Sequence, residues 1–141
     1  AKALKFGQVR TQFGVKRHTP NIADSNPKYR SADERVSVNS PIQGSSGQGL
    51  IFSLVMFNMR MRMLYGSEWN QVACVINSVH DSAIGWCHKD HTQDVLKWLQ
   101  KSMNCPPTLE YFDFDFAEIM MKTDVETGAN WKDLAKFEFN N

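Results

Sequence analysis

Two short stretches of the chain have the pattern of β-hairpins. Over residues 7–17, β-type residues lie on both sides of Gly14. Over residues 71–87, two apolar runs flank a polar segment that contains His80 and Asp81. Each stretch is therefore expected to form two antiparallel strands around a turn.

Helical periodicity covers residues 29–65 and, more briefly, residues 91–103. The first stretch is interrupted by "NSPIQGSSGQG", where Pro41 removes a backbone donor and three glycines follow, so a kink or break is expected there. Beyond it, apolar residues at i, i+3 and i+4 predict a core-facing side made of Leu50, Ile51, Leu54, Val55, Met59 and Met63. The second helix should turn Val95, Trp98, Leu99 and Met103 inward.

The order of these elements predicts the fold class. Residues 109–128, "LEYFDFDFAEIMMKTDVETG", are rich in strand-forming residues and follow the second helix. A hairpin, a long helix, a second hairpin, a helix and further strands favour an α+β domain with an antiparallel sheet covered on one face. A length of 141 residues suits one such domain.

Composition restricts the classes of protein that fit. The chain has 42% hydrophobic and 22% charged residues and no apolar run of about 18 residues, so no membrane partner is expected. The first residues lack the apolar core of a signal peptide, which favours a cytoplasmic location. Three cysteines without metal-type spacing are expected to be reduced thiols.

The small net charge of +1 hides an uneven distribution. Residues 1–40 contain eight Lys and Arg against three acids, which gives +5 and leaves −4 for residues 41–141. Such a basic segment indicates contact with a polyanion, and a merely solvated basic face is the alternative.

Three polar residues in the first helix share one side of it. Arg35, Asn39 and Gln43 are spaced i, i+4 and i+8, which places them within an arc of roughly 80° on a helix. Their donors suit acceptors on nucleic-acid bases and sugars, so they could follow a minor groove. The alternative is an ordinary polar helix surface. Because Pro41 lies between Asn39 and Gln43, it can end the helix before the last step of this spacing.

Asp81 could be a metal ligand or simply a turn residue. A carboxylate at the end of an apolar strand is held rigidly, and carboxylates suit Mg²⁺. Two other groups offer alternative metal sites: Cys87 with His88 and His91 for zinc, and Asp113 with Asp115 for a cation. The first lacks paired four-ligand spacing, and the second also fits the polar face of a strand.

Several stretches together resemble one family. "VRTQFGVKRHTPNIADSNPKYRSADERVSVNSPIQGSSGQG" resembles the family A (polymerase I-like) DNA polymerase pattern T-x-x-G-R-x-R-x-x-P-x-I followed by A-E-R-x-x-x-N-x-P-I-Q-G. The residues in register are Thr11, Gly14, Arg17, Pro20, Ile22, Glu34, Arg35, Asn39, Pro41, Ile42, Gln43 and Gly44. "SVHDS" is similar to the third catalytic motif, Q-V-H-D-E, and "DVETGANWKD" to the closing V-x-x-G-x-N-W.

The resemblance implies a role for each matching residue. The chain would be the C-terminal part of a polymerase palm, with an antiparallel sheet packed on a long kinked helix. Asp81 matches the second of two aspartates that bind two Mg²⁺ ions for nucleotidyl transfer, and His80 matches a histidine near the primer terminus. The expected DNA-binding residues are Arg35, Asn39, Gln43, Arg17 and Lys16.

This chain departs from the family pattern in three places. Ser78 and Ser82 replace the glutamine and glutamate around Val-His-Asp, and loss of the acid should weaken metal binding. One basic position is lost in Gly14-Val15-Lys16-Arg17, and residues 108–117 resemble an insertion.

The family's first aspartate motif, fingers helix and thumb have no counterpart in residues 1–141. The chain is therefore expected to be inactive alone, with dNTP bound mainly by a complementary fragment that supplies these parts. The small first residue fits a split, phage-type enzyme, and an excised fragment or a chain separated by processing is the alternative. The alternatives are a non-catalytic duplex-binding module and a small zinc-binding interaction domain.

Overall fold

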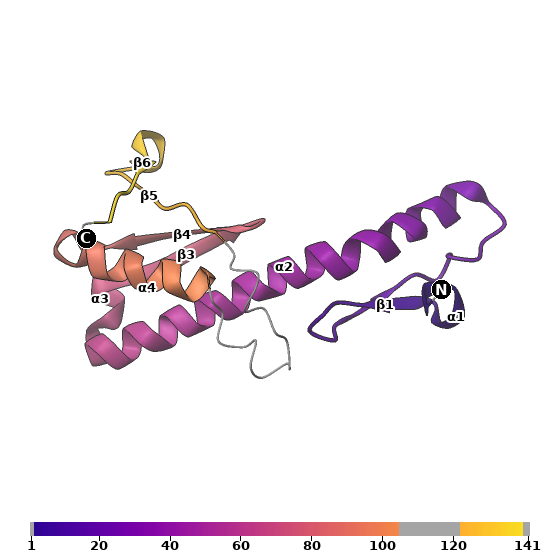
Figure 1. Cartoon of the computed structure of the whole chain (residues 1–141), viewed down its shortest axis with the longest axis horizontal. Coiled ribbons are helices and arrows are strands. Elements are labelled where there is room, and N and C mark those ends of the chain that lie inside the picture. The colour runs from indigo at the N-terminus through magenta and orange to yellow at the C-terminus, as the bar shows by residue number, and fades with distance from the viewer. Residues whose placement is uncertain (1, 105–121, 140–141) are drawn as a thin grey trace. The chain divides into compact units, whose positions relative to one another are not determined.

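The computed structural model describes residues 2–104 and 122–139 (Figure 1). In chain order its elements are α1 (Lys2–Phe6), β1 (Gln8–Arg10), β2 (Lys16–His18), α2 (Pro27–Tyr65), the 3₁₀ helix η1 (Gly66–Glu68), α3 (Trp69–Val72), β3 (Ala73–Val79), β4 (Ser82–Cys87), η2 (Lys89–His91), α4 (Thr92–Asn104), β5 (Glu126–Thr127), η3 (Trp131–Asp133) and β6 (Ala135–Lys136). The chain divides into two compact units, Ala1–Gln48 and Gly49–Asn141, where the sequence led us to expect one.

The fold class is α+β, which confirms the prediction. Within the described residues the strands form three two-stranded antiparallel sheets, β1–β2, β3–β4 and β5–β6. Most of the strand-rich stretch 109–128, with Asp113 and Asp115, lies outside the described residues, as does the expected insertion at residues 108–117. No helix in the part of the chain that the structure describes is long and apolar enough to cross a membrane.

The long helix α2 continues through Pro41, so of the kink or break expected at "NSPIQGSSGQG" the break is absent. Proline removes one intrahelical hydrogen bond, and neighbouring bonds keep the helix together on either side of it. Ser45 Oγ donates a hydrogen bond to the Pro41 carbonyl and accepts one, 2.9 Å long, from the Gln12 backbone. The proline therefore lies where the loop between β1 and β2 is attached to the helix.

The first unit has a small core of its own. Ala3, Thr19 and Ile22 are buried, and the Thr19 backbone N–H donates to the Gly7 carbonyl at 2.8 Å. Gly14 has a positive φ of 83° in the loop between the two short strands, a conformation that glycine adopts without a steric penalty.

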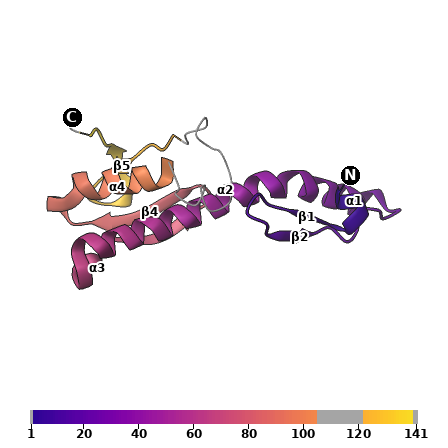
Figure 2. The same ribbon diagram turned by 60° about the horizontal axis from the view of Figure 1, so that its bottom comes forward.

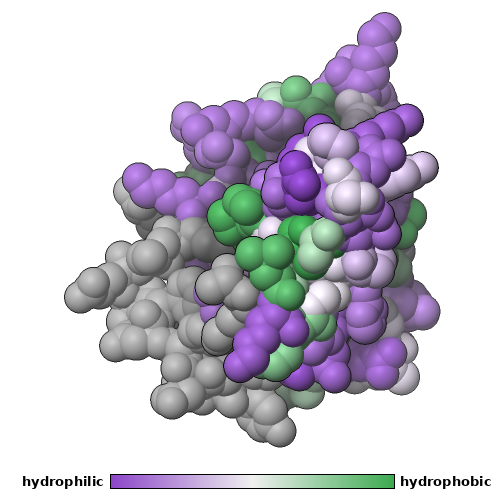
Figure 3. Space-filling view, turned by 90° about the vertical axis from the view of Figure 1, so that its right-hand side faces the viewer, coloured by the Kyte–Doolittle hydropathy of each residue, from purple (hydrophilic) through white to green (hydrophobic). Residues whose placement is uncertain are grey.

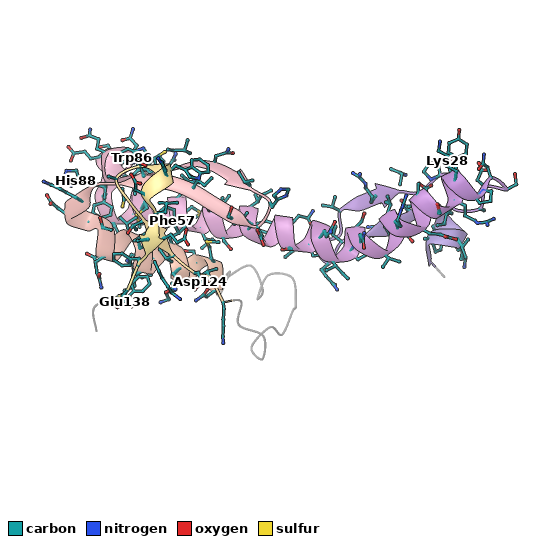
Figure 4. The ribbon with its side chains drawn as sticks, turned by 90° about the horizontal axis from the view of Figure 1, so that it is seen from above. Lys28, Phe57, Trp86, His88, Asp124 and Glu138 are labelled. Atoms are coloured by element: carbon teal, nitrogen blue, oxygen red, sulfur yellow. The ribbon has the colours of Figure 1, made fainter. Side chains whose placement is uncertain are left out.

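In the second unit, α2 and α4 run alongside the β3–β4 hairpin (Figure 2). Phe57 and Met61 of α2 form the core with Ala73 of β3 and Val95 of α4. The Arg60 guanidinium lies over the Trp98 ring, 4.0 Å from its centroid, which adds a cation–π contact between α2 and α4. In Figure 4, Phe57 lies among the elements of this unit.

The side of α2 that faces this core is only partly the one that the sequence predicted. Leu50 is buried and Leu54 half-buried as expected, but the helix also turns Ser53, Phe57 and Met61 inward. The residues left exposed are Ile51, Val55, Met59 and Met63. Because this part of α2 is apolar on two sides, periodicity did not decide between them; Phe57 fills the core, and Ser53 is buried with its hydroxyl donating to the Gly49 carbonyl at 2.9 Å.

Candidate catalytic hairpin and nucleic-acid interface

The tip of the β3–β4 hairpin is the candidate catalytic site. Val79 pairs with Ser82, so His80 and Asp81 are the two residues of the turn. His80 has a positive φ of 54°, the only such non-glycine residue in the described chain. Positive φ at the first turn position alone is the pattern of a type II′ turn, where glycine is the usual residue. Sequence reasoning found both residues but not this backbone conformation.

A β-bulge lies between the base of the hairpin and its tip. Val75 pairs with Gly85, but the next pair joins Asn77 to Ile84, so Ile76 is the extra residue. A Cβ on Gly85 would lie 2.5 Å from the Cys74 carbonyl oxygen, so only glycine fits there. Bulges increase local twist and redirect the strand beyond them. The direction in which the tip presents Asp81 therefore depends on this bulge.

The Asp81 carboxylate is exposed and has no hydrogen bond or ion pair with any described residue. It contributes to the lining of an open cavity of about 490 Å³ between the hairpin, α4 and residues 122–128. Ser82, beside Asp81, donates its hydroxyl to the Val79 carbonyl at 2.8 Å. Asp81 is thus the one carboxylate of the turn and is free to accept an external ligand.

The zinc alternative has no support in the geometry. Within residues 2–104 and 122–139, no three His, Cys, Asp or Glu side chains are grouped as a metal site would need. Cys87 Sγ lies 3.7 Å from Thr92 Oγ1, and His88 Nδ1 accepts a hydrogen bond from the Asp90 backbone. His91 lies edge-on to Tyr65 with ring centroids 5.2 Å apart. These side chains lie at the end of β4 and in the turn around η2 that leads into α4.

The polar ridge, defined as Arg35, Asn39 and Gln43, lies on a continuous helix, so the arc of roughly 80° inferred from spacing applies to it. All three side chains are exposed, and none has a hydrogen bond or ion pair with the rest of the described chain. Lys16 and Arg17 lie on β2, where they pair with Arg10 and Val9, and are also exposed. These five residues belong to the first unit, whereas His80 and Asp81 belong to the second.

The three acids of the first unit are engaged within it. Asp24 Oδ1 accepts from the Asn26 backbone at 2.7 Å, and Asp33 Oδ2 from the Asn21 backbone at 2.6 Å. Glu34 lies 3.8 Å from Arg30 Nε. The Lys28 side chain points away from α2 (Figure 4). The unit, at +5 by count, therefore presents free cations and donors to an anionic ligand.

Comparisons with known proteins agree with the sequence motifs. The model of DNA polymerase family A matches residues 1–133. The DNA polymerase of Bacillus phage SP01 is 29% identical over 126 residues, which are 89% of this chain and 13% of that protein. DNA polymerase I of Bacillus caldotenax is 26% identical over 132 residues, which are 94% of this chain and 14% of that protein.

A solved structure shares the fold. The polymerase domain of Pol1 from M. smegmatis, in complex with DNA primer-template and dNTP, matches with a TM-score of 0.64 and 22% identity, over 73% of this chain and 17% of that one. The chain thus spans about one seventh of the length of the polymerases that it matches. A family model that covers residues 1–133, nearly the whole chain, shows that the chain belongs to DNA polymerase family A.

Proposed function

We propose that residues 1–141 supply one catalytic aspartate and a duplex-binding surface to a template-directed DNA polymerase. The observation that carries this proposal is Asp81, an exposed carboxylate on a two-residue turn, in a chain matched almost throughout by family A polymerases. The second aspartate, the fingers and the thumb would come from a complementary fragment. Because these parts have no counterpart in residues 1–141, this chain alone is inactive.

The side chains at the turn fit a shared Mg²⁺ site. Mg²⁺ is commonly bound through one or two carboxylates together with water and substrate phosphates. Asp81 offers one carboxylate, while Ser82 offers no charge and is already bonded to Val79. Bound between Asp81 and a carboxylate of the complementary fragment, two Mg²⁺ ions would stabilise charge on the attacking and leaving oxygens of nucleotidyl transfer.

The chain's own residues would bind and position the duplex. Arg35, Asn39 and Gln43 present donors along one face of α2, which suits acceptors at base edges and sugars in a minor groove. Lys16 and Arg17 would add phosphate contacts, whose strength falls as the salt concentration rises. His80, beside Asp81 in the turn, would lie near the primer terminus. The dNTP would be bound mainly by the complementary fragment.

Two features support the need for a complementary fragment. The exposed α2 stripe, which we define as Ile51, Val55, Met59 and Met63, is 48–75% exposed and forms one apolar helix side. In addition, β3 and β4 pair only with each other in the described part of the chain, so no described strand covers the outer edge of either. Unpaired edges and apolar stripes are both stabilised when another part of a protein covers them.

Primer extension by a reconstituted pair would test the catalytic role. The complementary fragment is to be prepared from the rest of a family A polymerase and mixed with this chain, with Mg²⁺ and a primed template. Extension should require both fragments and should be lost with Asp81→Asn, which keeps the side-chain shape and removes the charge. Full extension by that variant would refute the role of Asp81. If the two fragments do not co-purify, the complementation is wrong.

Ser82 favours a second candidate function, a non-catalytic module that keeps the duplex contacts. Replacement of the family's acid by serine leaves one carboxylate at the turn. This function predicts salt-dependent duplex binding by the chain and no metal-dependent extension with any complementary fragment. Extension by the reconstituted pair would exclude it.

A further inference from the structure

The polar ridge of α2 has two exposed apolar neighbours. Val38 and Ile42 are 66% and 71% exposed and stand one helical turn apart. At about 100° per residue, Ile42 lies roughly 20° and Val38 roughly 60° from Arg35, on the side away from Gln43. We call this pair the apolar rail. Figure 3 shows that a mainly hydrophilic surface of the molecule carries apolar side chains between the polar ones.

Single exposed apolar residues are common on protein surfaces and need no explanation. The rail differs because its two members are adjacent, both β-branched, and run parallel to three free polar side chains. β-Branched side chains have few χ1 rotamers, so this surface is stiff. A stiff apolar strip beside a line of donors suits a ligand that presents acceptors and apolar surface side by side.

The charge of the first unit favours a nucleic acid as that ligand. Its three acids are held by Asn26, Asn21 and Arg30, while Arg35 has no partner in the described chain. A duplex minor groove presents base acceptors on its floor and sugars along its walls. In DNA the 2′ carbon of each sugar carries only hydrogen, whereas RNA displays a 2′-hydroxyl there.

We propose that the apolar rail packs against deoxyribose and makes this surface selective for DNA over ribose-containing duplexes. This inference rests on the duplex contact of the proposed function. With DNA, the rail and the sugar exclude water from each other at little cost. With ribose, each 2′-hydroxyl held against Val38 or Ile42 loses water and gains no hydrogen-bond partner, which is unfavourable. The ridge supplies binding, and the rail supplies the discrimination between sugars.

The experiment compares two labelled duplexes of one sequence by fluorescence anisotropy with the 141-residue chain at low salt. One duplex is DNA, and the other alternates ribose and deoxyribose along one strand, so that every register presents 2′-hydroxyls. We expect about tenfold tighter binding of the DNA duplex, which corresponds to the free-energy cost of burying one hydroxyl without a hydrogen-bond partner. The double variant Val38→Thr, Ile42→Thr provides hydroxyl partners and should reduce this ratio to about twofold or less. Ile51→Thr, an exposed β-branched residue of the same helix outside the rail, should leave the ratio unchanged.

The outcomes separate the rail from the function on which it rests. Absence of binding to either duplex, or binding unaffected by the triple variant Arg35→Ala, Asn39→Ala, Gln43→Ala, overturns both. Ridge-dependent binding with equal affinity for the two duplexes, or with a ratio unchanged in the double variant, overturns the rail alone. If the double variant instead loses only its association with the complementary fragment, the rail is a protein interface and the proposal is wrong.

Discussion

At the scale of single residues, His80 has a backbone conformation that its side chain disfavours. A non-glycine residue in the left-handed region costs about 1–2 kcal/mol, and such strain is often kept at functional sites. We expect His80→Gly to raise the free energy of unfolding by about 0.5–1 kcal/mol, after allowing for the greater entropy of unfolded glycine. Urea denaturation of the chain would measure this gain.

The same substitution should lower primer extension by the reconstituted pair, because it removes the imidazole proposed to lie near the primer terminus. His80→Asn separates the two effects, since asparagine tolerates positive φ but lacks the ring. A destabilised His80→Gly variant would show that the turn is not strained. Equal extension by all three proteins would show that the imidazole has no part in the reaction.

Ser82 is the position at which the resemblance to the family pattern has a glutamate, so a carboxylate can be introduced there by substitution. Its hydroxyl makes one local bond to the Val79 carbonyl, worth about 1 kcal/mol, so replacement should be tolerated. We expect Ser82→Glu to lower the Mg²⁺ concentration for half-maximal extension several-fold, because a second carboxylate would lie beside Asp81. Ser82→Gln, of the same shape without charge, should leave the Mg²⁺ requirement unchanged. The same shift with both variants would contradict the electrostatic explanation.

At the scale of elements, the bulge in the β3–β4 hairpin depends on Gly85. An added Cβ would meet the Cys74 carbonyl oxygen at 2.5 Å and the Val75 Cα at 3.3 Å, both backbone atoms that move only with the strand. Gly85→Ala should therefore reduce the free energy of unfolding by about 1–3 kcal/mol, measured by denaturant titration. It should also reduce extension, because the tip that carries Asp81 would be displaced.

Gly47→Ala is the matched control for that variant. Gly47 lies within α2, and an added Cβ would have no neighbour within 4 Å. Replacing an open helical glycine by alanine should stabilise the chain by about 0.5–1 kcal/mol. If the two alanine variants changed stability equally, the close approach of Gly85 to Cys74 would not explain the first result.

The sequence predicted some elements better than others for physical reasons. The hairpin that carries His80 and Asp81 was predicted because two polar residues between two apolar runs are typical of a turn between strands. The helix α4 was predicted because its apolar residues lie on one narrow side. The predicted inward side of α2 was only partly right, because Phe57 and Met61 fill the core while an equally apolar side of the helix stays exposed. Of the kink or break expected at Pro41, the break is absent because one proline removes a single bond from a helix of 39 residues.

The candidate site was predicted in the same uneven way. Residue types and spacing left Asp81 and the polar ridge open between a functional and a structural role, and the resemblance to family A polymerases made them the candidates. The left-handed backbone of His80, the bulge at Ile76 and the exposure of Val38 and Ile42 were not predicted. Each of these depends on pairing register or on which helix side is packed, and both are decided by contacts between distant parts of the chain.

At the scale of the whole molecule, the exposed α2 stripe is an apolar surface that favours association with another part of a protein. It has four apolar residues at i, i+4, i+8 and i+12, and the chain spans about one seventh of its polymerase relatives. We propose that the complementary fragment covers this stripe. Burial of two such side chains contributes about 3 kcal/mol, or about a hundredfold in association.

The double variant Val55→Glu, Met59→Lys tests this interface. Both residues are exposed, and Glu with Lys at i and i+4 supports a helix, so the stability of the isolated chain should change by less than about 0.5 kcal/mol. Association with the complementary fragment, measured by titration calorimetry, should weaken about a hundredfold. The control carries the same pair at Val38 and Ile42, also exposed on α2, and should keep its association while altering duplex binding. If the Val55 and Met59 variant associates as well as the unaltered chain, the stripe is not the interface, and the outer edges of β3 and β4 become the surface to test.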